Sequence, residues 1–264
     1  MQFVRYSLLI SSMLVAGCAG VHNPEDPLEP LNRGVYRFND ALDKAFLKPV
    51  AKGYSAVMPT PGKNMVTNFF SNLDDIMVTA NDLLQFKLAQ GFSDGMRFVV
   101  NSTIGVFGLI DVASAGGLKK HDEDFGQTLG KWGFGNGAYL VLPIIGPSTV
   151  RDGLGFFGDL YVDPMYYIDD MSTRNLTYLF QKVSRRAGLL DQEKVMDEAL
   201  IDRYQFMRDI YLLHRQSLLY DGNPPRKKYD YDDEGDDTAL PQDSPASDLP
   251  LPKNAVHPSD AAPQ

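Results

Sequence analysis

The sequence is poor in cysteine, in basic residues and in long apolar runs, and each shortage excludes a class of protein. One cysteine among 264 residues leaves no intramolecular disulfide, so packing must stabilise the fold. The net charge is −9, with 34 acidic against 25 basic residues, which argues against nucleic acid as a partner because no basic stripe can release counterions from phosphates. No apolar run reaches the roughly 20 residues of a membrane-spanning helix.

Familiar catalytic motifs are missing too, so we expect no enzyme and no cofactor. There is no Gly-x-Ser-x-Gly elbow, His-Glu-x-x-His pair or P-loop. Residues 153–158 match the dinucleotide Gly-x-Gly-x-x-Gly pattern, but we expect no buried strand over 147–152, and Asp169 and Asp170 follow too closely for a ribose contact. Helix-packing glycines explain the match better. Residues 121–124 are interpreted as capping acids ahead of a helix rather than as a metal site.

The single cysteine, Cys18, follows a segment with the order of a secretion signal. Arg5 supplies a positive charge, residues 6–15 are mostly apolar, and the small residues Ala16 and Gly17 precede the cysteine. The stretch is too short to span a bilayer, so we expect cleavage between Gly17 and Cys18 and lipidation of the thiol. The alternative is a buried cysteine in an N-terminal helix, which the surrounding signal pattern disfavours.

Cys18 resembles the lipidated cysteine of bacterial lipoproteins, which implies an N-terminal diacylglyceryl group and a further N-acyl chain. One acyl chain binds a membrane only marginally, whereas three chains make the anchorage effectively permanent. Ala19 stands where an Asp commonly retains lipoproteins in the inner membrane. The resemblance therefore implies the periplasmic leaflet of the outer membrane of a Gram-negative bacterium.

The composition divides the chain into four parts. We expect a signal peptide over 1–17, a lipidated linker over 18–27, a helical domain over 28–220 and a disordered tail over 221–264. The last 44 residues contain ten acidic against four basic residues and eight of the 17 prolines. Such a composition cannot bury enough apolar surface to offset chain entropy. Its acidic run, 230–237, is interpreted as solvated rather than as a metal site.

Helical periodicity dominates the body, so we expect an all-α fold of short and medium helices. Apolar residues recur every three or four positions in 61–86 and in 190–219, which predicts one helix in each segment. The first apolar face consists of Met65, Phe69, Leu73, Ile76, Ala80 and Leu84, with Asn68, Asn72 and Asp75 on other faces. The second consists of Met196, Leu200, Tyr204, Met207, Tyr211 and Leu218, with charges such as Arg208 lying off it. The glycine-rich segment 97–170 predicts many corners and no run of strands.

One apolar run, 138–145, lies between two glycines. It is too short to span a membrane, and Pro143 interrupts it. Two interpretations remain open: a buried core segment, or a loop that dips into one leaflet of a bilayer.

A dense block of motifs lies between Arg97 and Gly153. It consists of RFVVNSTIG (97–105), GLIDVA (108–113), DFGQTLGKWG (124–133), YLVLP (139–143) and GPSTVRD (146–152). The earlier segment DPLEPLNR (26–33), followed by Tyr36, Phe38 and Asn39, and the later segment 204–215 extend the match. Together these segments closely resemble the MlaA (VacJ) family of outer-membrane lipoproteins.

The resemblance implies a fold and a function. Members of that family are ring-shaped, all-helical proteins that lie in one leaflet of the outer membrane and enclose a path for phospholipid. By resemblance we expect a non-enzymatic component of intermembrane phospholipid transport. It would remove phospholipid from the outer leaflet and pass it to the periplasmic carrier MlaC, which maintains lipid asymmetry. A trimeric porin of the OmpC/OmpF kind is the expected partner.

The candidates for the lipid path lie beside the glycine-rich corners. Gln127 and Lys131 lie one helical turn apart and offer polar groups to lipid headgroups, although capping or surface ion pairing explains them equally well. Trp132 suits either a membrane interface or the core. Gly135 and Gly137 are expected along the path itself. Two other functions stay open: a tether that positions a porin without conducting lipid, and a lipid hydrolase with an unrecognised site.

Overall fold

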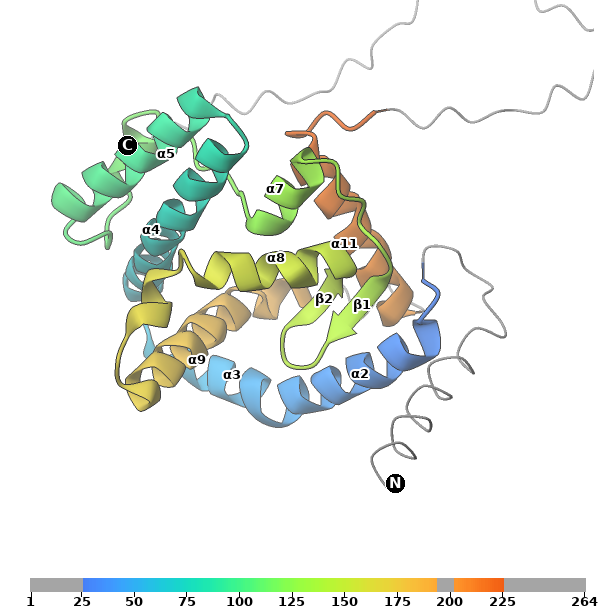
Figure 1. Cartoon of the computed structure of the whole chain (residues 1–264). Helices are drawn as coiled ribbons and strands as arrows, with labels where there is room; N and C mark the ends of the chain where they lie inside the picture. Colours follow the sequence, from blue (N-terminus) through green and yellow to red (C-terminus); the bar gives the residue numbers. More distant parts are fainter. Residues whose placement is uncertain (1–25, 194–201, 226–264) are drawn as a thin grey trace, which may run out of the picture. The chain divides into compact units, whose positions relative to one another are not determined.

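The computed structural model describes residues 26–193 and 202–225. The expected signal peptide, the lipidated Cys18 and most of the acidic tail lie outside the described residues. The described helices are α2 (Glu29–Leu42), α3 (Lys48–Val57), α4 (Thr60–Leu84), α5 (Leu88–Thr103), α6 (Val112–Ala115), α7 (Phe125–Lys131), α8 (Val150–Leu160), α9 (Met171–Gly188) and α11 (Arg203–Leu219). A π-helical turn, Asp43–Leu47, joins α2 to α3, and a 3-10 turn, Pro164–Tyr167, follows α8 (Figure 1). The all-α class is confirmed, and within the described ranges no helix is long and apolar enough to cross a bilayer.

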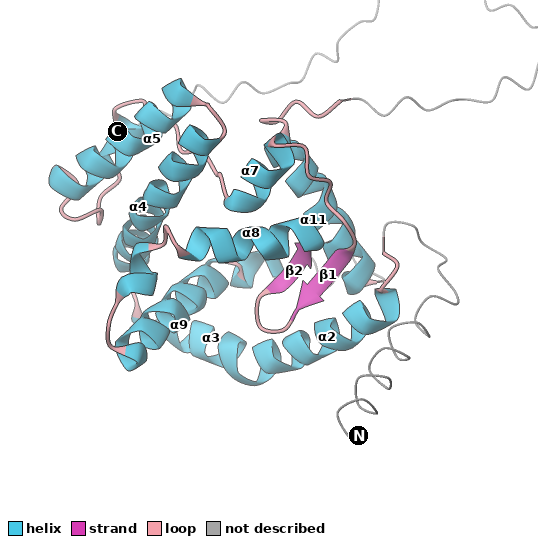
Figure 2. Cartoon of the chain, in the orientation of Figure 1, coloured by secondary structure: helices cyan, strands magenta, loops and turns pink. Residues whose placement is uncertain are grey.

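Two strands interrupt the helices, contrary to the expectation of none (Figure 2). β1 (Tyr139–Leu142) and β2 (Gly146–Thr149) pair antiparallel, with Tyr139 opposite Thr149. β1 and the turn after it lie in the apolar run 138–145. The buried-core interpretation of that run is confirmed for β1, and the insertion of its turn into a leaflet stays a prediction. Tyr139 and Val141 are buried against Tyr204 of α11, whereas Ile144 in the turn is exposed.

Side chains of α2 replace a third strand on the free edge of β1. Asn32 donates from Nδ2 to the carbonyl of Tyr139 at 3.0 Å and accepts from the N–H of Val141 at 2.9 Å. Two helical turns further along α2, Asn39 likewise donates to the carbonyl of Leu142 and accepts from the N–H of Ile144. Because unpaired backbone groups are costly to bury, these asparagines let so short a hairpin sit in a helical fold.

Helix α4 confirms the predicted helix over 61–86, but the predicted apolar face is not its most buried face. Its buried residues are Phe70, Asn72, Asp75, Val78, Asn81 and Asp82. Met65 and Leu84, placed on the inner face by periodicity, are each 40% exposed. The amides are buried because they have partners: Asn72 donates to Ser102 at 2.9 Å, and Asn81 donates to Asp159 at 3.0 Å.

The predicted single helix over 190–219 is wrong at Asp202. That residue is extended and caps α11, accepting from the N–H groups of Tyr204 and Gln205. Its carboxylate also pairs with Arg33 of α2 at 2.8 Å. Two members of the predicted apolar face, Met196 and Leu200, lie outside the described residues.

The glycines of 153–158 pack helices, as the sequence suggested, although a strand does precede them. β2 ends at Thr149, which caps α8, but it belongs to an antiparallel pair and not to a parallel dinucleotide-binding sheet. A Cβ on Gly155 would lie 2.4 Å from the backbone nitrogen of Gly126 in α7. A Cβ on Gly158 would lie 2.4 Å from the ring of Phe125.

Candidate functional site

Large apolar side chains cover much of the outside of the described chain. Val57, just before α4, is 85% exposed, and Phe86, just after α4, is 84% exposed. Others more than 60% exposed are Leu31, Phe46, Leu88, Phe92, Ile104, Phe107, Phe134, Ile144, Leu154, Phe157, Tyr161, Tyr167, Met171, Leu176 and Leu213. Isolated exposed apolar residues are ordinary, but a set this dense marks a surface that meets an apolar partner.

In three turns, exposed apolar residues adopt a strained backbone conformation. Phe86, Val106, Phe107 and Ile144 have φ between 54° and 67°, a region that side chains other than glycine rarely adopt. All four are exposed, so burial does not impose these conformations. Strain of this kind costs on the order of 1–3 kcal/mol per residue and concentrates at functional positions.

Charged groups fill the inside instead. Arg97 of α5 is 1% exposed and lies 3.2 Å from Asp111, which caps α6. Its guanidinium also donates to Ser114 at 3.0 Å and to the carbonyl of Leu118. Burial disfavours ionisation of Asp111, but hydrogen bonds from Ser114 and Asn101 and the charge of Arg97 outweigh it and lower its pKa to about 2. This cluster fastens the loop after α5, with its apolar tip at Phe107, to the α4–α5 hairpin.

A second buried arginine, Arg215 of α11, joins three helices. It donates to Asp152 of α8 from Nε at 3.0 Å and from Nη2 at 2.8 Å. Nη2 also donates to Asp124, the N-cap of α7, at 2.9 Å. Asp124 in turn accepts from the N–H of Gln127, which confirms the expected capping role for this residue of 121–124. Glu123 instead pairs with Lys87 at 2.6 Å. The prediction that charges of this helix lie off the buried face is wrong for Arg208, which is also buried.

A pair of buried carboxyl groups links α4 to α5. Asp82 and Asp94 are both fully buried, and each has one oxygen that accepts no hydrogen bond from another residue. Asp94 pairs with Nδ1 of His121 at 2.7 Å through its other oxygen. Burial, followed by the neighbouring carboxyl group of Asp94, raises the pKa of Asp82 to about 8. Asp82 therefore holds a proton at neutral pH.

The predicted path residues lie in and after α7 but do not share one cavity. Gln127 is buried and donates to the carbonyl of Asp122 at 2.9 Å. Lys131 forms an ion pair with Asp221 at 3.2 Å, which fits the alternative of surface ion pairing. Trp132 is half exposed and donates to the carbonyl of Leu84 at 3.2 Å.

The two predicted glycines have different surroundings. A Cβ on Gly135 would meet open space, whereas Gly137 has φ +67° and would place a Cβ 2.9 Å from Val150. Contact of these glycines and of the α7 residues with lipid stays a prediction. The described residues contain no cluster of three or more metal-binding side chains.

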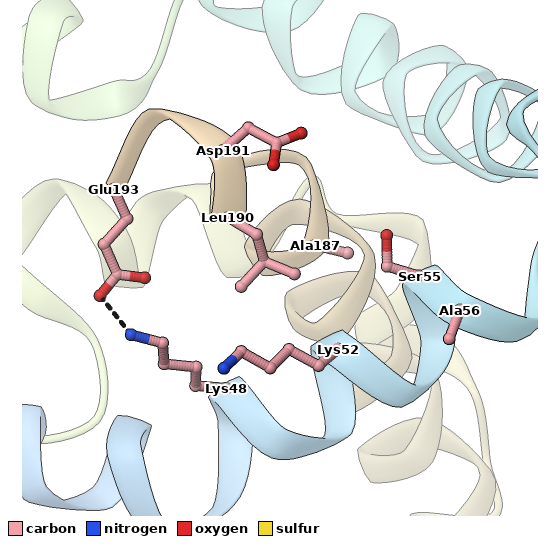
Figure 3. A pocket seen from close by; sticks show the side chains of 8 residues that line it. All are labelled: Lys48, Lys52, Ser55, Ala56, Ala187, Leu190, Asp191 and Glu193. Carbon is pink, nitrogen blue, oxygen red and sulfur yellow. Dashed lines mark hydrogen bonds and ion pairs between the residues drawn. The ribbon is translucent and has the colours of Figure 1, made fainter. Parts of the chain in front are cut away.

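Sequence reasoning missed Arg97 and Arg215, and it missed two openings beside α9. One is a polar cavity of about 380 Å³ between α3 and α9, lined in part by Lys48 and Lys52 (Figure 3). The other is an apolar groove of about 440 Å³ between α4 and α9. No local pattern singled out Arg97 or Arg215, because a buried arginine and a surface arginine look alike in sequence.

Paired charges inside and apolar side chains outside define a class of helical proteins built to meet a lipid or an apolar protein surface. Comparison with known sequences identifies the family: the chain belongs to the MlaA lipoprotein family, whose sequence model matches residues 24–218. It is 33% identical to the intermembrane phospholipid transport system lipoprotein MlaA of Escherichia coli K12, over 82% of this chain and 88% of that one. The protein of the same name from Haemophilus influenzae is 31% identical, over 81% and 89% of the two chains.

A solved structure supports the assignment. It comes from work on the structural basis for maintenance of bacterial outer membrane lipid asymmetry, and it superimposes with a TM-score of 0.66 at 32% identity. The match covers 74% of this chain and 98% of the other. The helical arrangement described above is therefore that of the family.

Proposed function

We propose that this protein is the lipid-anchored outer-membrane component of an intermembrane phospholipid transport system. It removes phospholipids from the outer leaflet and passes them to a periplasmic carrier of the MlaC kind, without catalysing a reaction. Acyl chains on Cys18 hold it to the periplasmic leaflet, and a trimeric porin is its partner in the membrane. The names of its relatives in Escherichia coli and Haemophilus influenzae support this role.

The observation that carries the proposal is the reversed distribution of polarity. Hydrocarbon accepts exposed Phe, Val and Leu side chains at no cost, whereas it penalises unpaired charge. The exterior bears apolar tips at Phe86, Phe107 and Ile144, and the buried Arg97 and Arg215 are both paired. A protein that lies in one leaflet and does not span it needs this arrangement.

The experiment compares cells with and without the protein. Outer-leaflet phospholipid is measured with a membrane-impermeant label in wild-type cells, in deletion cells, and in deletion cells that carry either the native gene or its Cys18→Ser form. We expect labelled phospholipid to rise severalfold on deletion, to return to wild-type levels with the native gene, and to stay high with Cys18→Ser. Unchanged labelling in the deletion cells would refute the proposal.

Two further measurements separate the alternatives. A lipid hydrolase would release lysophospholipid or free fatty acid from vesicles that contain the purified protein, and we expect neither. A pure porin tether would tolerate a charge along the lipid path. Gly135→Glu is the better test here, because Gly135 has open space beside it, whereas Gly137→Glu would clash with Val150. We expect Gly135→Glu to keep porin binding and to lose lipid removal.

A further inference from the structure

Two openings that differ in polarity adjoin α9. The polar cavity at the C-terminal part of α9 is lined by Lys48, Lys52, Ser55, Ala187, Leu190 and Glu193, among others (Figure 3). The apolar groove at its N-terminal part is lined chiefly by Phe69, Phe70, Leu109, Leu176, Thr177 and Phe180. An amphiphilic ligand has the same division between a polar and an apolar end.

Both openings lie on one face of α9. Thr173, Thr177 and Phe180 line the groove, and Ala187 lines the cavity. Their spacings of four, three and seven residues place them on one helical stripe. From Thr173 to Ala187 the helix rises roughly 21 Å. Half of the 40–45 Å thickness of a bilayer, headgroups included, is also about 21 Å, which is the length of one phospholipid.

The polar end offers a cation, Lys52, for which the described residues supply no ion-pair partner. Its side chain lines the cavity together with that of Lys48 (Figure 3). The carboxylate of Glu193 is already bound by Lys48 at 3.0 Å and by Arg186 at 2.6 Å. Asp191 points away from the two lysines (Figure 3). The ammonium of Lys52 therefore remains available to an anionic group such as phosphate.

An aromatic wall continues from the groove towards the cavity. The rings of Phe69 and Phe70 lie 5.4 Å apart, and those of Phe70 and Phe180 lie 6.1 Å apart. Phe180 then meets Tyr54 of α3 edge-on at 5.9 Å. Tyr54 and the cavity-lining Ser55 both belong to α3, so the aromatic contacts end at the helix that borders the polar cavity.

We propose that this face of α9 binds one phospholipid molecule. Its phosphate lies at Lys52, and one acyl chain lies along Phe69, Phe70 and Phe180. The proposal rests on the proposed transport function, for which it names a binding site. Attraction by Lys52 selects the anionic headgroup, and the aromatic wall supplies the area that an acyl chain buries.

The test measures lipid retained by the purified full-length protein, using native mass spectrometry after release from non-ionic detergent. Three probes are compared: phosphatidylglycerol, a diacylglycerol with the same acyl chains, and inorganic phosphate. We expect retention of phosphatidylglycerol, retention of diacylglycerol about tenfold weaker, and no retention of phosphate, since a charged hydrogen bond contributes about one order of magnitude in affinity. Phosphate binding as tight as that of the lipid would make this a plain anion site and would overturn the proposal.

Two variants with matched controls locate the site. Lys52→Glu should weaken phosphatidylglycerol binding about tenfold and leave diacylglycerol binding unchanged. Its control is Lys119→Glu, at another exposed lysine without an ion-pair partner among the described residues. Thr177→Trp should fill the groove and weaken both lipids. Its control is Thr103→Trp, because both threonines hydrogen-bond only to the preceding turn of their own helix.

Several outcomes would reject the site. The site would be rejected if Lys52→Glu retained as much phosphatidylglycerol as the wild type. It would also be rejected if Lys119→Glu lost as much phosphatidylglycerol as Lys52→Glu, because the loss would then be an unspecific effect of charge. Failure of the site is distinguishable from failure of the function. If deletion cells keep their lipid asymmetry while Lys52→Glu still loses lipid, the transport function is refuted and the site stands. If deletion disturbs lipid asymmetry and Lys52→Glu binds lipid normally, the transport function stands and the site is rejected.

Discussion

Arg215 of α11 donates two hydrogen bonds to Asp152 of α8, from Nε at 3.0 Å and from Nη2 at 2.8 Å. Both side chains are almost fully buried, so neither charge can be solvated if the other is removed. Together with the N-cap Asp124, this pair holds three helices at one point. Its contribution to the free energy of unfolding is therefore that of a buried network and not that of a surface ion pair.

Arg215→Met should accordingly lower the free energy of unfolding by about 3 kcal/mol, because it removes the buried cation that Asp124 and Asp152 share and leaves Asp152 with Arg151 alone. Urea denaturation in detergent micelles measures the change. The matched control is Arg185→Met, since Arg185 is exposed and its ion pair with Asp74 should contribute less than about 1 kcal/mol. Equal effects of the two substitutions would contradict the network.

The sequence predicts the helices better than it predicts which of their faces is buried. The bounds of α4 follow from Pro61 and the apolar period, and Cys18 and the MlaA motifs predict the family. The inner face of α4 does not follow, because periodicity assumes that apolar residues point inward. At a surface that meets hydrocarbon this assumption fails. Asn72 and Asp82 are then buried with polar partners that lie 30 and 8 residues away.

The hairpin and the helix break were missed for a related reason. β1 depends on hydrogen bonds from Asn32, more than 100 residues earlier in the chain, so no local pattern reveals it. The break before α11 depends on Asp202, whose capping of Tyr204 and pairing with Arg33 outweigh a continuous helical period. Polar contacts between residues far apart in the sequence therefore determine both the hairpin and the helix break.

Stability should fall as the pH rises from 6 to 8, because the buried carboxyl group of Asp82 then loses its proton. The pKa of Asp82, about 8 in the folded protein, lies above the value of 3.8 for a free carboxyl. The folded state therefore binds more protons than the unfolded state in this window, and ionisation destabilises it by less than about 1.4 kcal/mol per pH unit. Glu123, Lys87 and His121 also face the pair.

The effect is isolated by comparing wild type with Asp82→Asn, which keeps the shape of the side chain and cannot ionise. Urea unfolding at several pH values should show a smaller loss of stability between pH 6 and 8 in Asp82→Asn. Asp169→Asn, at an exposed position, serves as control and should leave the slope unchanged. Parallel curves for wild type and Asp82→Asn would show that Asp82 does not ionise in this pH range.

Gly155→Ala should destabilise the protein by about 1–3 kcal/mol, because the new methyl group would press on the backbone of Gly126. Gly53→Ala is the matched control: Gly53 is also inside a helix, α3, but nothing lies within 4 Å of the added Cβ. Gly53→Ala should stabilise by about 0.5–1 kcal/mol through helix propensity. Thermal unfolding of both variants checks the sign, and destabilisation by Gly53→Ala would contradict the packing described here.

Phe107→Gly should separate stability from membrane contact. Glycine relieves the positive φ of 57° and should stabilise the fold by about 1 kcal/mol, while the variant loses an exposed apolar ring. In a background with Cys18→Ser, flotation with phospholipid vesicles should weaken. Unchanged flotation would mean that this tip does not touch lipid.

The central claim, that the apolar exterior faces acyl chains, is tested most directly by the depth of a spin label. With Cys18 replaced by Ser, a nitroxide is attached through Phe107→Cys, Phe86→Cys or Lys119→Cys, and the protein is bound to phospholipid vesicles. Collisions with oxygen, which dissolves in hydrocarbon, are compared with collisions with a water-soluble nickel complex. We predict that the labels at 107 and 86 collide mainly with oxygen and the label at 119 with nickel. Nickel-dominated relaxation at 107 and 86 would contradict the account.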